Sequence, residues 1–422
     1  MALVAQTYFG DFMTDRFHNT SLLLLVILAA GLAIGLWALG ASFLVQPLSA
    51  GGVTVTKSIA ALAKDALFVP LKPLMYALII MSIASSVAIS RGGMGAKFVR
   101  VFMFFVGFSL LGMILAITAF SVFSGLPILP DPSTIGSASA DLKQTSFAVK
   151  IYGVLTSALM ISIYAGLFFG AALKKINMGE AADKMSDIFI AGFRKFLQYT
   201  IPLAVFGSIT LALNKPGGVE TLANLFPVLL PYFMAMLLVW LVMVIITSVI
   251  QGRGVAFVLN AILPQALVAF STSSSMATLP ATKIACDQLG ANGDESTPFF
   301  TIGATINMVG TLIGLLLLSL YSMKAFGLEF GISDMIIVGF QSLIFATAAA
   351  GTPSASVVLL QDILVSQGVS AEYATYVTGL IITIDTLILD RLRTVLNTQS
   401  DSMSTANGLK LYYRTPKTLS VD

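Results

Sequence analysis

Residues 303–318 read GATINMVGTLIGLLLL, a stretch that begins with small and polar residues and continues as the apolar middle of a membrane helix. Gly303, Thr305, Asn307 and Gly310 lie where such a helix would normally be apolar. In lipid, backbone N–H and C=O groups need partners inside the protein, so irregular backbone is tolerated only where it is buried or lines a cavity. We therefore interpret this stretch as a membrane helix interrupted at a binding site.

The composition of the 422-residue chain also indicates a membrane protein, because 57% of the residues are hydrophobic and only 10% are charged. A hydrocarbon core of about 30 Å needs roughly 20 apolar residues per helix. Runs of that kind predict an all-α polytopic membrane protein with eight transmembrane helices, near 21–45, 65–90, 98–124, 147–173, 196–213, 224–251, 299–322 and 371–396.

Two further apolar segments, 254–285 and 335–368, are interrupted at their middle by FSTSSSMATLP and AAAGTPSAS. Polar and Pro residues at that depth predict the tips of two re-entrant helical hairpins, one entering from each side. Broken helices of this kind place helix N-termini and free carbonyl groups around substrates and cations. Alternatively, either segment contains only a patch of small residues that lets helices pack closely, without a hairpin tip.

The distribution of Lys and Arg predicts the orientation, because these residues are more numerous on the side that carries both termini. We expect a multi-pass protein of the cell (plasma or inner) membrane with both termini in the cytoplasm. The single cysteine, Cys286, excludes an intrachain disulfide, and the single histidine, His18, leaves no imidazole pair for catalysis or zinc. The net charge of +3 reflects topology, so we expect lipid and a small molecule as partners and no nucleic acid.

The last apolar run contains a charged segment, IDTLILDRLRTVLNTQSDSMST, at residues 384–405. At about 100° per residue, five polar side chains share one stripe of this helix: Asp390, Arg393, Thr394, Asn397 and Asp401. By the same rule Asp385 falls on the far side, near the outer interface. A charge at the centre of a membrane helix costs roughly 2.5–3.5 kcal/mol, so the stripe is a candidate functional site.

The residue types in the stripe suggest what it binds. The planar fork of Arg393 suits a carboxylate and Asp390 suits an ammonium group. The oxygen atoms of Asn397 and Asp401 suit a hard cation. Alternatively, Asp390 forms an internal ion pair with Arg393 or Arg391.

Together these motifs resemble the dicarboxylate/amino acid:cation symporter family, the sodium-coupled glutamate and aspartate transporters. GATINMVGT is similar to that family's GATINMDGT, and LDRLRT followed by Asn397 and Asp401 resembles its eighth-span signature. SSSMATLP resembles the serine-rich first hairpin tip, and AAAGTPSAS is similar to the family's second tip but is about two residues shorter. The resemblance covers most of the chain and implies a glutamate-transporter-like elevator fold assembled as a homotrimer.

The resemblance also divides the chain into two parts. It implies a scaffold at residues 1–97 (spans 1 and 2) and 147–213 (spans 4 and 5). It implies a transport part at 98–124 (span 3) and 224–406 (span 6, hairpin 1, span 7, hairpin 2 and span 8). Residues 407–422 would then form a cytoplasmic tail.

For the substrate, the resemblance implies that Asp390 holds the amino group and Arg393 the side-chain carboxylate of an acidic amino acid. It implies further hydrogen bonds from three side chains, Thr311, Thr394 and Asn397. The main-chain carboxylate would meet two hydroxyls of the first tip, Ser274 and Ser275. Arg391 matches the members that carry an arginine in the eighth span and a serine, here Ser273, in the first hairpin.

For the coupling ions, the resemblance implies one site built from backbone carbonyls of Gly303, Asn307 and Asn397 and the Asp401 carboxylate. It implies a second from Thr305 and backbone of the second tip, near Ala349, Ala350 and Thr352. A third site would need the aspartate of NMDG and hydroxyls of the third span. Val309, Phe105 and Phe108 occupy those positions, so fewer than three sodium ions are expected.

The expected function is therefore sodium-driven import of aspartate or glutamate with an altered cation stoichiometry, without an organic cofactor and without enzymatic activity. A proton-coupled or uncoupled transporter of dicarboxylates or amino acids is an alternative, as is an anion-conducting channel. A receptor that binds an amino acid without moving it is a further one. An intramembrane enzyme using Ser273, Ser274 or Ser275 would lack a neighbouring base.

Overall fold

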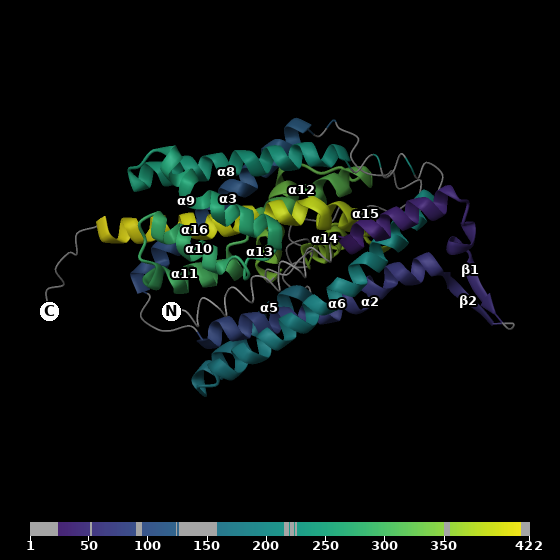
Figure 1. The fold of residues 1–422 in the computed structure, drawn as a ribbon, viewed down its shortest axis with the longest axis horizontal. Helices are drawn as coiled ribbons and strands as arrows, with labels where there is room; N and C mark the ends of the chain where they lie inside the picture. Colours follow the sequence, from purple (N-terminus) through teal and green to yellow (C-terminus); the bar gives the residue numbers. More distant parts are fainter. Residues whose placement is uncertain are drawn as a thin grey trace.

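The computed structural model describes residues 24–50, 53–89, 95–123, 125, 158–214, 219, 223, 226–349 and 355–414. It begins with an apolar helix, Leu24–Ala38. The elements that follow are η1 (Ser42–Val45), β1 (Pro47–Ala50), β2 (Val53–Ser58), α2 (Ile59–Ile89), α3 (Gly95–Phe123), α5 (Ala158–Lys175), α6 (Gly179–Leu213), η3 (Phe226–Val228), α8 (Leu229–Gln251), α9 (Val255–Thr272), α10 (Leu279–Gln288), α11 (Gly293–Ile306), α12 (Val309–Ala325), α13 (Ile332–Ala348), α14 (Ala355–Ser366), α15 (Ala371–Ile384), η4 (Asp385–Leu389) and α16 (Asp390–Arg414). Apart from the antiparallel pair β1 and β2, these residues are helical or irregular, which agrees with the predicted all-α class (Figure 1).

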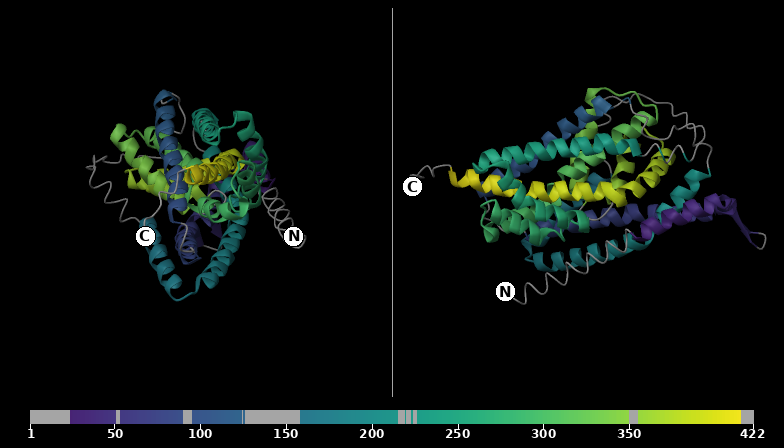
Figure 2. Two further views of the ribbon diagram at one scale, coloured as in Figure 1. Left: turned by 90° about the vertical axis from the view of Figure 1, so that its left-hand side faces the viewer. Right: turned by 45° about the horizontal axis from the view of Figure 1, so that its top comes forward.

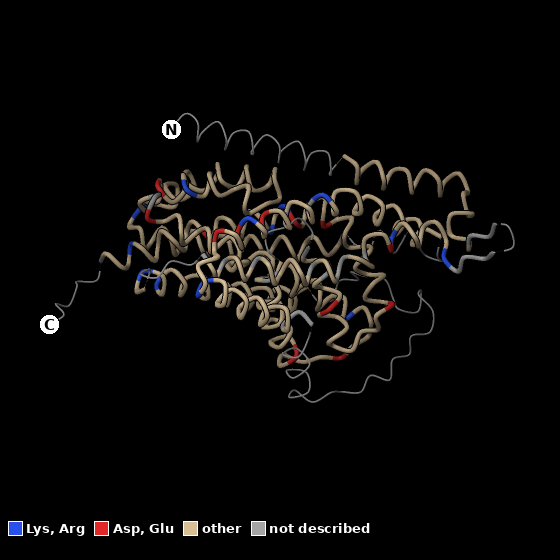
Figure 3. Tube along the Cα trace, turned by 90° about the horizontal axis from the view of Figure 1, so that it is seen from below, with Lys and Arg blue, Asp and Glu red and all other residues tan. Residues whose placement is uncertain are grey.

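Several of these helices are long and apolar enough to cross a membrane. Within the described residues they are Gly95–Phe123, Gly179–Leu213, Leu229–Gln251, Val255–Thr272 and Glu295–Ala325. Figure 3 shows long stretches without charge along the helices, interrupted by a few charged positions. The membrane class is therefore confirmed, whereas the eight-span arrangement with re-entrant hairpins and the predicted domain bounds stay predictions. The start of the predicted fourth span, 147–157, lies outside the described residues.

The helices form two groups in space. α2 packs along α6 and α5, and the three run along the lower side of the molecule in Figure 1. The other group surrounds α16, which contacts α3, α8, α9, α10, α11 and α12. The end-on view of Figure 2 shows α16, in yellow, among these neighbours. The predicted stripe of polar residues is therefore carried by a helix that the other helices of the second group surround.

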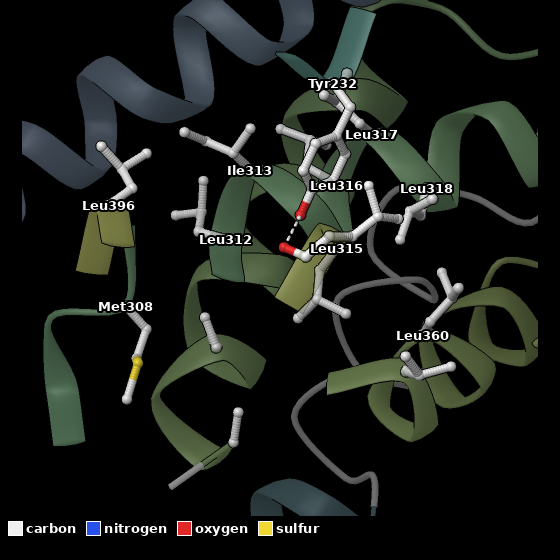
Figure 4. Packing of buried hydrophobic residues seen from close by; sticks show 14 of the residues in the cluster. Tyr232, Met308, Leu312, Ile313, Leu315, Leu316, Leu317, Leu318, Leu360 and Leu396 are labelled. Atoms are coloured by element: carbon white, nitrogen blue, oxygen red, sulfur yellow. Dashed lines mark hydrogen bonds between the residues drawn. The ribbon is translucent and has the colours of Figure 1, made fainter. Parts of the chain in front are cut away.

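α12 adjoins α16 and is buried from Val309 to Met323. Figure 4 shows how its leucine and isoleucine side chains, Leu312 and Ile313 among them, pack against Tyr232 of α8, Leu360 of α14 and Leu396 of α16. A helix that is apolar on all sides is stable only where other elements cover every side of it. α12 thus forms the apolar centre against which α16 lies.

Two helix pairs and one break match the interruptions read from the sequence. α9 and α10 are joined through residues 273–278, within FSTSSSMATLP. α13 and α14 flank the second predicted tip, of which residues 350–354 lie outside the described residues. The predicted seventh span is two helices, α11 and α12, separated at Asn307 and Met308.

Candidate functional site

The break between α11 and α12 is held by a side chain from another helix. Asn397 of α16 accepts hydrogen bonds at Oδ1 from the backbone N–H groups of Gly310 (2.7 Å) and Thr311 (3.3 Å). The first N–H groups of a helix have no partner within the helix and need one from elsewhere. Asn397 also donates from Nδ2 to the Thr311 hydroxyl at 3.0 Å. One amide of α16 therefore fixes both the start of α12 and its first hydroxyl.

Gly310 and Gly314 allow α12 to lie directly against α16. A Cβ atom at Gly310 would lie 2.5 Å from the carbonyl oxygen of Arg393, and one at Gly314 would lie 2.8 Å from both Cδ of Arg393 and the Tyr232 hydroxyl. Small residues spaced four apart let two membrane helices approach closely. The sequence GTLIG after the break is therefore a contact surface as well as the head of an apolar helix.

A candidate cation site lies beside the break at Asp401, which is 1% exposed. Asn307 donates from Nδ2 to Asp401 Oδ1 at 2.8 Å, and a Cβ atom at Gly303 would lie 2.6 Å from that same oxygen. Oδ1 of Asn307 has no hydrogen-bond partner among the described residues. Burial of a carboxylate is costly unless opposite charge or hydrogen bonds compensate it. The predicted residues Gly303, Asn307 and Asp401 thus lie together as an oxygen-rich set that suits a hard cation.

The second predicted cation site is described only in part. Thr305 lies in the last turn of α11, where its hydroxyl donates to the carbonyl of Ile302 at 2.8 Å. Ala349 is buried at the end of α13. Ala350 and Thr352 lie outside the described residues.

Apolar packing occupies the positions that the resemblance assigns to a third cation site. Val309, Phe105 and Phe108 are all buried. A Cβ atom at Gly112 of α3 would lie 3.2 Å from a methyl group of Val309, and one at Gly303 would lie 3.0 Å from the ring of Phe105. Val309 and Phe105 make carbon contacts between α3 and the break, and none of the three side chains offers an oxygen.

A cavity lies between the first tip, the end of α13, the start of α14, the break and α16. Its lining consists of Ser273, Ser275, Met308, Thr311, Ala349, Ser356, Asp390, Thr394 and Asn397. The predicted residues Ser275, Thr311, Asp390, Thr394 and Asn397 therefore share one cavity. Its volume is about 20 Å³, enough for roughly one water molecule, so an amino acid fits only after the lining moves apart. Ser356 and Met308 also line the cavity and were not predicted; for Ser356, the serine and the proline of TPSAS were the available signal.

Arg393 is outside this lining and is held in a buried ion-pair cluster. Its Nη1 and Nη2 bond the two carboxylate oxygens of Asp385 at 2.5 and 3.0 Å, and Nη2 also bonds Asp390 at 2.9 Å. Asp385 is 0% exposed and Arg393 is 2% exposed. The internal ion pair considered for Asp390 is therefore present, and Asp385 is its second acid.

The prediction that Asp385 lies on the far side of the last helix was wrong. It assumed an uninterrupted α-helix, whereas residues Asp385–Leu389 form a π turn in which the N–H of Asp390 bonds the carbonyl of Asp385. A π turn takes up one residue more than an α turn. That extra residue rotates Asp385 by about 100° and brings it to the side of Arg393.

Arg391 contacts the C-terminal end of α9, the first helix of the α9–α10 pair. Its Nη1 donates to the backbone carbonyls of Phe270 (2.7 Å) and Ser271 (3.2 Å), and its guanidinium lies over the ring of Phe270. Cations at the C-terminal end of a helix satisfy its last carbonyls. Arg391 therefore bonds the end of α9 and lies outside the described cavity lining, and its predicted contact with substrate stays a prediction.

The first tip turns sharply after α9. Ser273 has a left-handed backbone (φ 49°), which is uncommon for a residue other than glycine. The hydroxyl of Ser274 accepts from the N–H of Ala277 at 3.3 Å, and its carbonyl accepts from the Thr278 hydroxyl at 2.8 Å. Ser274 thus stabilises the turn, while Ser273 and Ser275 face the cavity.

Comparison with known proteins gives a consistent result. The family model described as "Sodium:dicarboxylate symporter family" matches residues 20–407. The serine/threonine transporter SstT of Acinetobacter baumannii strain ATCC 17978 is 27% identical over 360 residues, which cover 80% of this chain and 86% of that protein. The same-named protein of strain SDF is 26% identical over 418 residues, which cover 93% and 98% of the two chains.

Proposed function

The chain belongs to the sodium:dicarboxylate symporter family. From that premise we propose that it is a secondary active symporter that imports an amino acid, driven by the inward movement of sodium down its gradient. The amino group of the substrate would be held by Asp390, in the cavity between the two predicted hairpin tips. The sodium ion would be held at Asp401. Both residues belong to α16 and are buried.

The observation that carries this proposal is that the break between α11 and α12 is hydrogen-bonded both to the cavity lining, at Asn397, and to the candidate cation site, at Asp401. Asn397 lines the cavity and caps α12, while Asn307, two residues before α12, bonds Asp401. A cation that orders Asn307 therefore also orders the start of α12 and the cavity beside it. Two ligands that stabilise the same arrangement raise each other's affinity, which is the requirement for coupled transport.

Two substrate classes have support. The pairing of Asp390 and Arg393 in the sequence favours an acidic amino acid, aspartate or glutamate. A neutral hydroxylated amino acid is favoured by the engagement of Arg393 with Asp385, which removes the cation from the described lining of the cavity. The substrates named for the two relatives are of that second class.

The number of coupled ions should be lower than in relatives with NMDG. Val309, Phe105 and Phe108 are all buried and offer no side-chain oxygen, which supports fewer than three sodium ions per substrate. We further propose an elevator-type homotrimer with eight spans and two re-entrant hairpins in the inner membrane, both termini being cytoplasmic. The group around α16 would carry the substrate past a scaffold that contains α2, α5 and α6.

Uptake into proteoliposomes tests the proposed function. Labelled L-serine, L-threonine, L-aspartate and L-glutamate are supplied under separate inward gradients of sodium, of protons and of potassium. We expect saturable uptake of at least one of them with the sodium gradient alone. Uptake that follows the proton gradient would contradict sodium coupling, and a large substrate-independent anion current without uptake would favour a channel.

A further inference from the structure

We propose that Asp385 sets the substrate class of this transporter: by occupying the guanidinium of Arg393, it selects neutral amino acids over acidic ones. This inference rests on the proposed function and assigns a role to a residue outside the predicted binding set.

The contacts of Arg393 show how complete the occupation is. Asp385 accepts from both terminal nitrogens of the guanidinium, in the two-bond geometry that a substrate carboxylate would need. Nη2 is shared with Asp390, and among the described residues only Nε has no partner. The edge of Arg393 best suited to a carboxylate is therefore already taken by an acid of the same chain.

The charge balance leads to the same conclusion. Asp385 and Arg393 are both fully enclosed and ion-paired, and Asp390, which shares Nη2 of Arg393, is the acid of this cluster that lines the cavity and would meet the ammonium group of a substrate. The side chain of a neutral amino acid brings no further charge into the cavity. The second carboxylate of an acidic substrate would stay unbalanced unless it displaced Asp385, which would leave that buried acid without its partner.

Packing places the stem of the Arg393 side chain outside the cavity lining, while its guanidinium reaches Asp390, which lines the cavity. Its Cδ lies against Gly314 of α12, on the side where the Tyr232 hydroxyl also lies. Tyr232 is anchored by a 3.4 Å hydrogen bond to the carbonyl of Leu389, which is the dashed line in Figure 4. The π turn supplies the remaining element, because it places Asp385 next to Arg393. The lining that remains consists mainly of hydroxyls and amides, among them Ser275, Thr311 and Thr394, which suit a small hydroxylated side chain.

The unmodified protein provides the first test. In proteoliposomes with a sodium gradient, uptake of labelled L-serine should be inhibited by excess L-threonine and not by excess L-aspartate. Sodium-dependent uptake that prefers L-aspartate would overturn the role of Asp385 while leaving the proposed symport intact. Absence of sodium-dependent uptake for every amino acid tested would refute the proposed function itself, and this inference with it.

The second test is Asp385→Asn, which removes the charge and keeps the shape. We expect the ratio of L-aspartate to L-serine uptake to rise about tenfold or more, because a charged hydrogen-bonding group becomes available. Asp287→Asn makes the same chemical change on an exposed carboxylate of α10 and should leave the ratio unchanged. A folded Asp385→Asn protein with an unchanged ratio would contradict the proposal.

A double variant covers the possibility that Asp385→Asn does not fold. Asp385→Asn combined with Arg393→Gln replaces the ion pair by two neutral amides, and it should still bind L-serine and not L-aspartate. Binding is measured without transport, as the rise in unfolding temperature that each amino acid causes in purified protein with sodium. Selective stabilisation by L-aspartate in the double variant would overturn the inference, because no arginine would then be responsible.

Discussion

α12 and α16 lie side by side and are both buried, yet they are built from opposite kinds of residue. The buried side chains of α12 are mainly apolar, the exceptions being Thr311, Ser319, Tyr321 and Ser322, whereas α16 encloses hydroxyls, amides and charges along most of its length. Many of the described polar groups of α16 form hydrogen bonds with residues of other helices. Gln399 bonds Trp240, and Gln265 bonds both Ser402 and the carbonyl of Thr398.

The difference indicates how the two helices contribute. An apolar helix in the centre of the group contributes packing and tolerates changes of shape better than changes of polarity. A polar helix in the same surroundings depends on partners for its polar groups, so the effect of a change in α16 depends on whether the altered group has a partner. Four substitutions test this contrast, two in α16 and two in α12.

The largest effect is expected from Asp401→Ala in α16. The variant removes the one charged oxygen ligand in the candidate cation site beside Gly303 and Asn307, so sodium-dependent uptake should fall to background. Uptake into proteoliposomes at rising sodium concentration measures this effect. Retention of the sodium response would show that the coupling ion binds elsewhere.

Val309→Asp places an acid in the apolar surroundings of α12. A buried charge without a partner typically costs about 3–5 kcal/mol, and we expect the free energy of unfolding to fall by that order. Thermal unfolding of the purified protein measures the change, with Val309→Leu as an uncharged control. Strong stabilisation of the aspartate variant by sodium would instead show that Phe105 and Phe108 can move aside to form a third cation site.

Gly310→Ala tests the contact between the two helices. The added methyl group would lie 2.5 Å from the carbonyl oxygen of Arg393, so α12 and α16 must move apart. Overpacking of this kind usually costs about 1–3 kcal/mol of stability. The matched control is Gly107→Ala, in α3, where a Cβ atom meets nothing within 4 Å. Gly327→Ala is unsuitable as a control, because the backbone of Gly327 is left-handed (φ 85°). Equal stability of Gly310→Ala and the control would contradict the close approach.

The smallest effect is expected from Thr405→Val in α16. The Thr405 hydroxyl is buried and has no hydrogen-bond partner among the described residues. Replacing an unmatched polar group by an apolar group of the same shape is nearly neutral or stabilising. Unfolding temperature and sodium-dependent uptake should both stay close to those of the unmodified protein. A marked loss of uptake would mean that this hydroxyl, like Asp401, serves a ligand.

The sequence allowed part of the site to be predicted. Asp390, Thr394 and Asn397 were placed on one stripe by helical periodicity alone, and the structure brings all three to one cavity. Asp385 was misplaced because no rule of composition or spacing identifies a π turn, which depends on the packing around it. The hydroxyl of Ser274 accepts from the N–H of Ala277, as a serine in a turn can, and its contact with substrate stays a prediction. The interruptions of the predicted hairpins were visible because Ser and Pro contrast with apolar arms.

The polar character of α16 also bears on how the protein reaches the membrane. Centre-of-helix charges are unfavourable in lipid by roughly 2.5–3.5 kcal/mol each, so the segment that begins at Asp385 is a poor candidate for entering the bilayer alone. It is the last helix of the described chain, and every helix that bonds it, from α3 to α12, is synthesised earlier. Insertion of α16 therefore depends on partners that are already in place. The helix that carries most of the candidate site is therefore the last of the described helices to be synthesised.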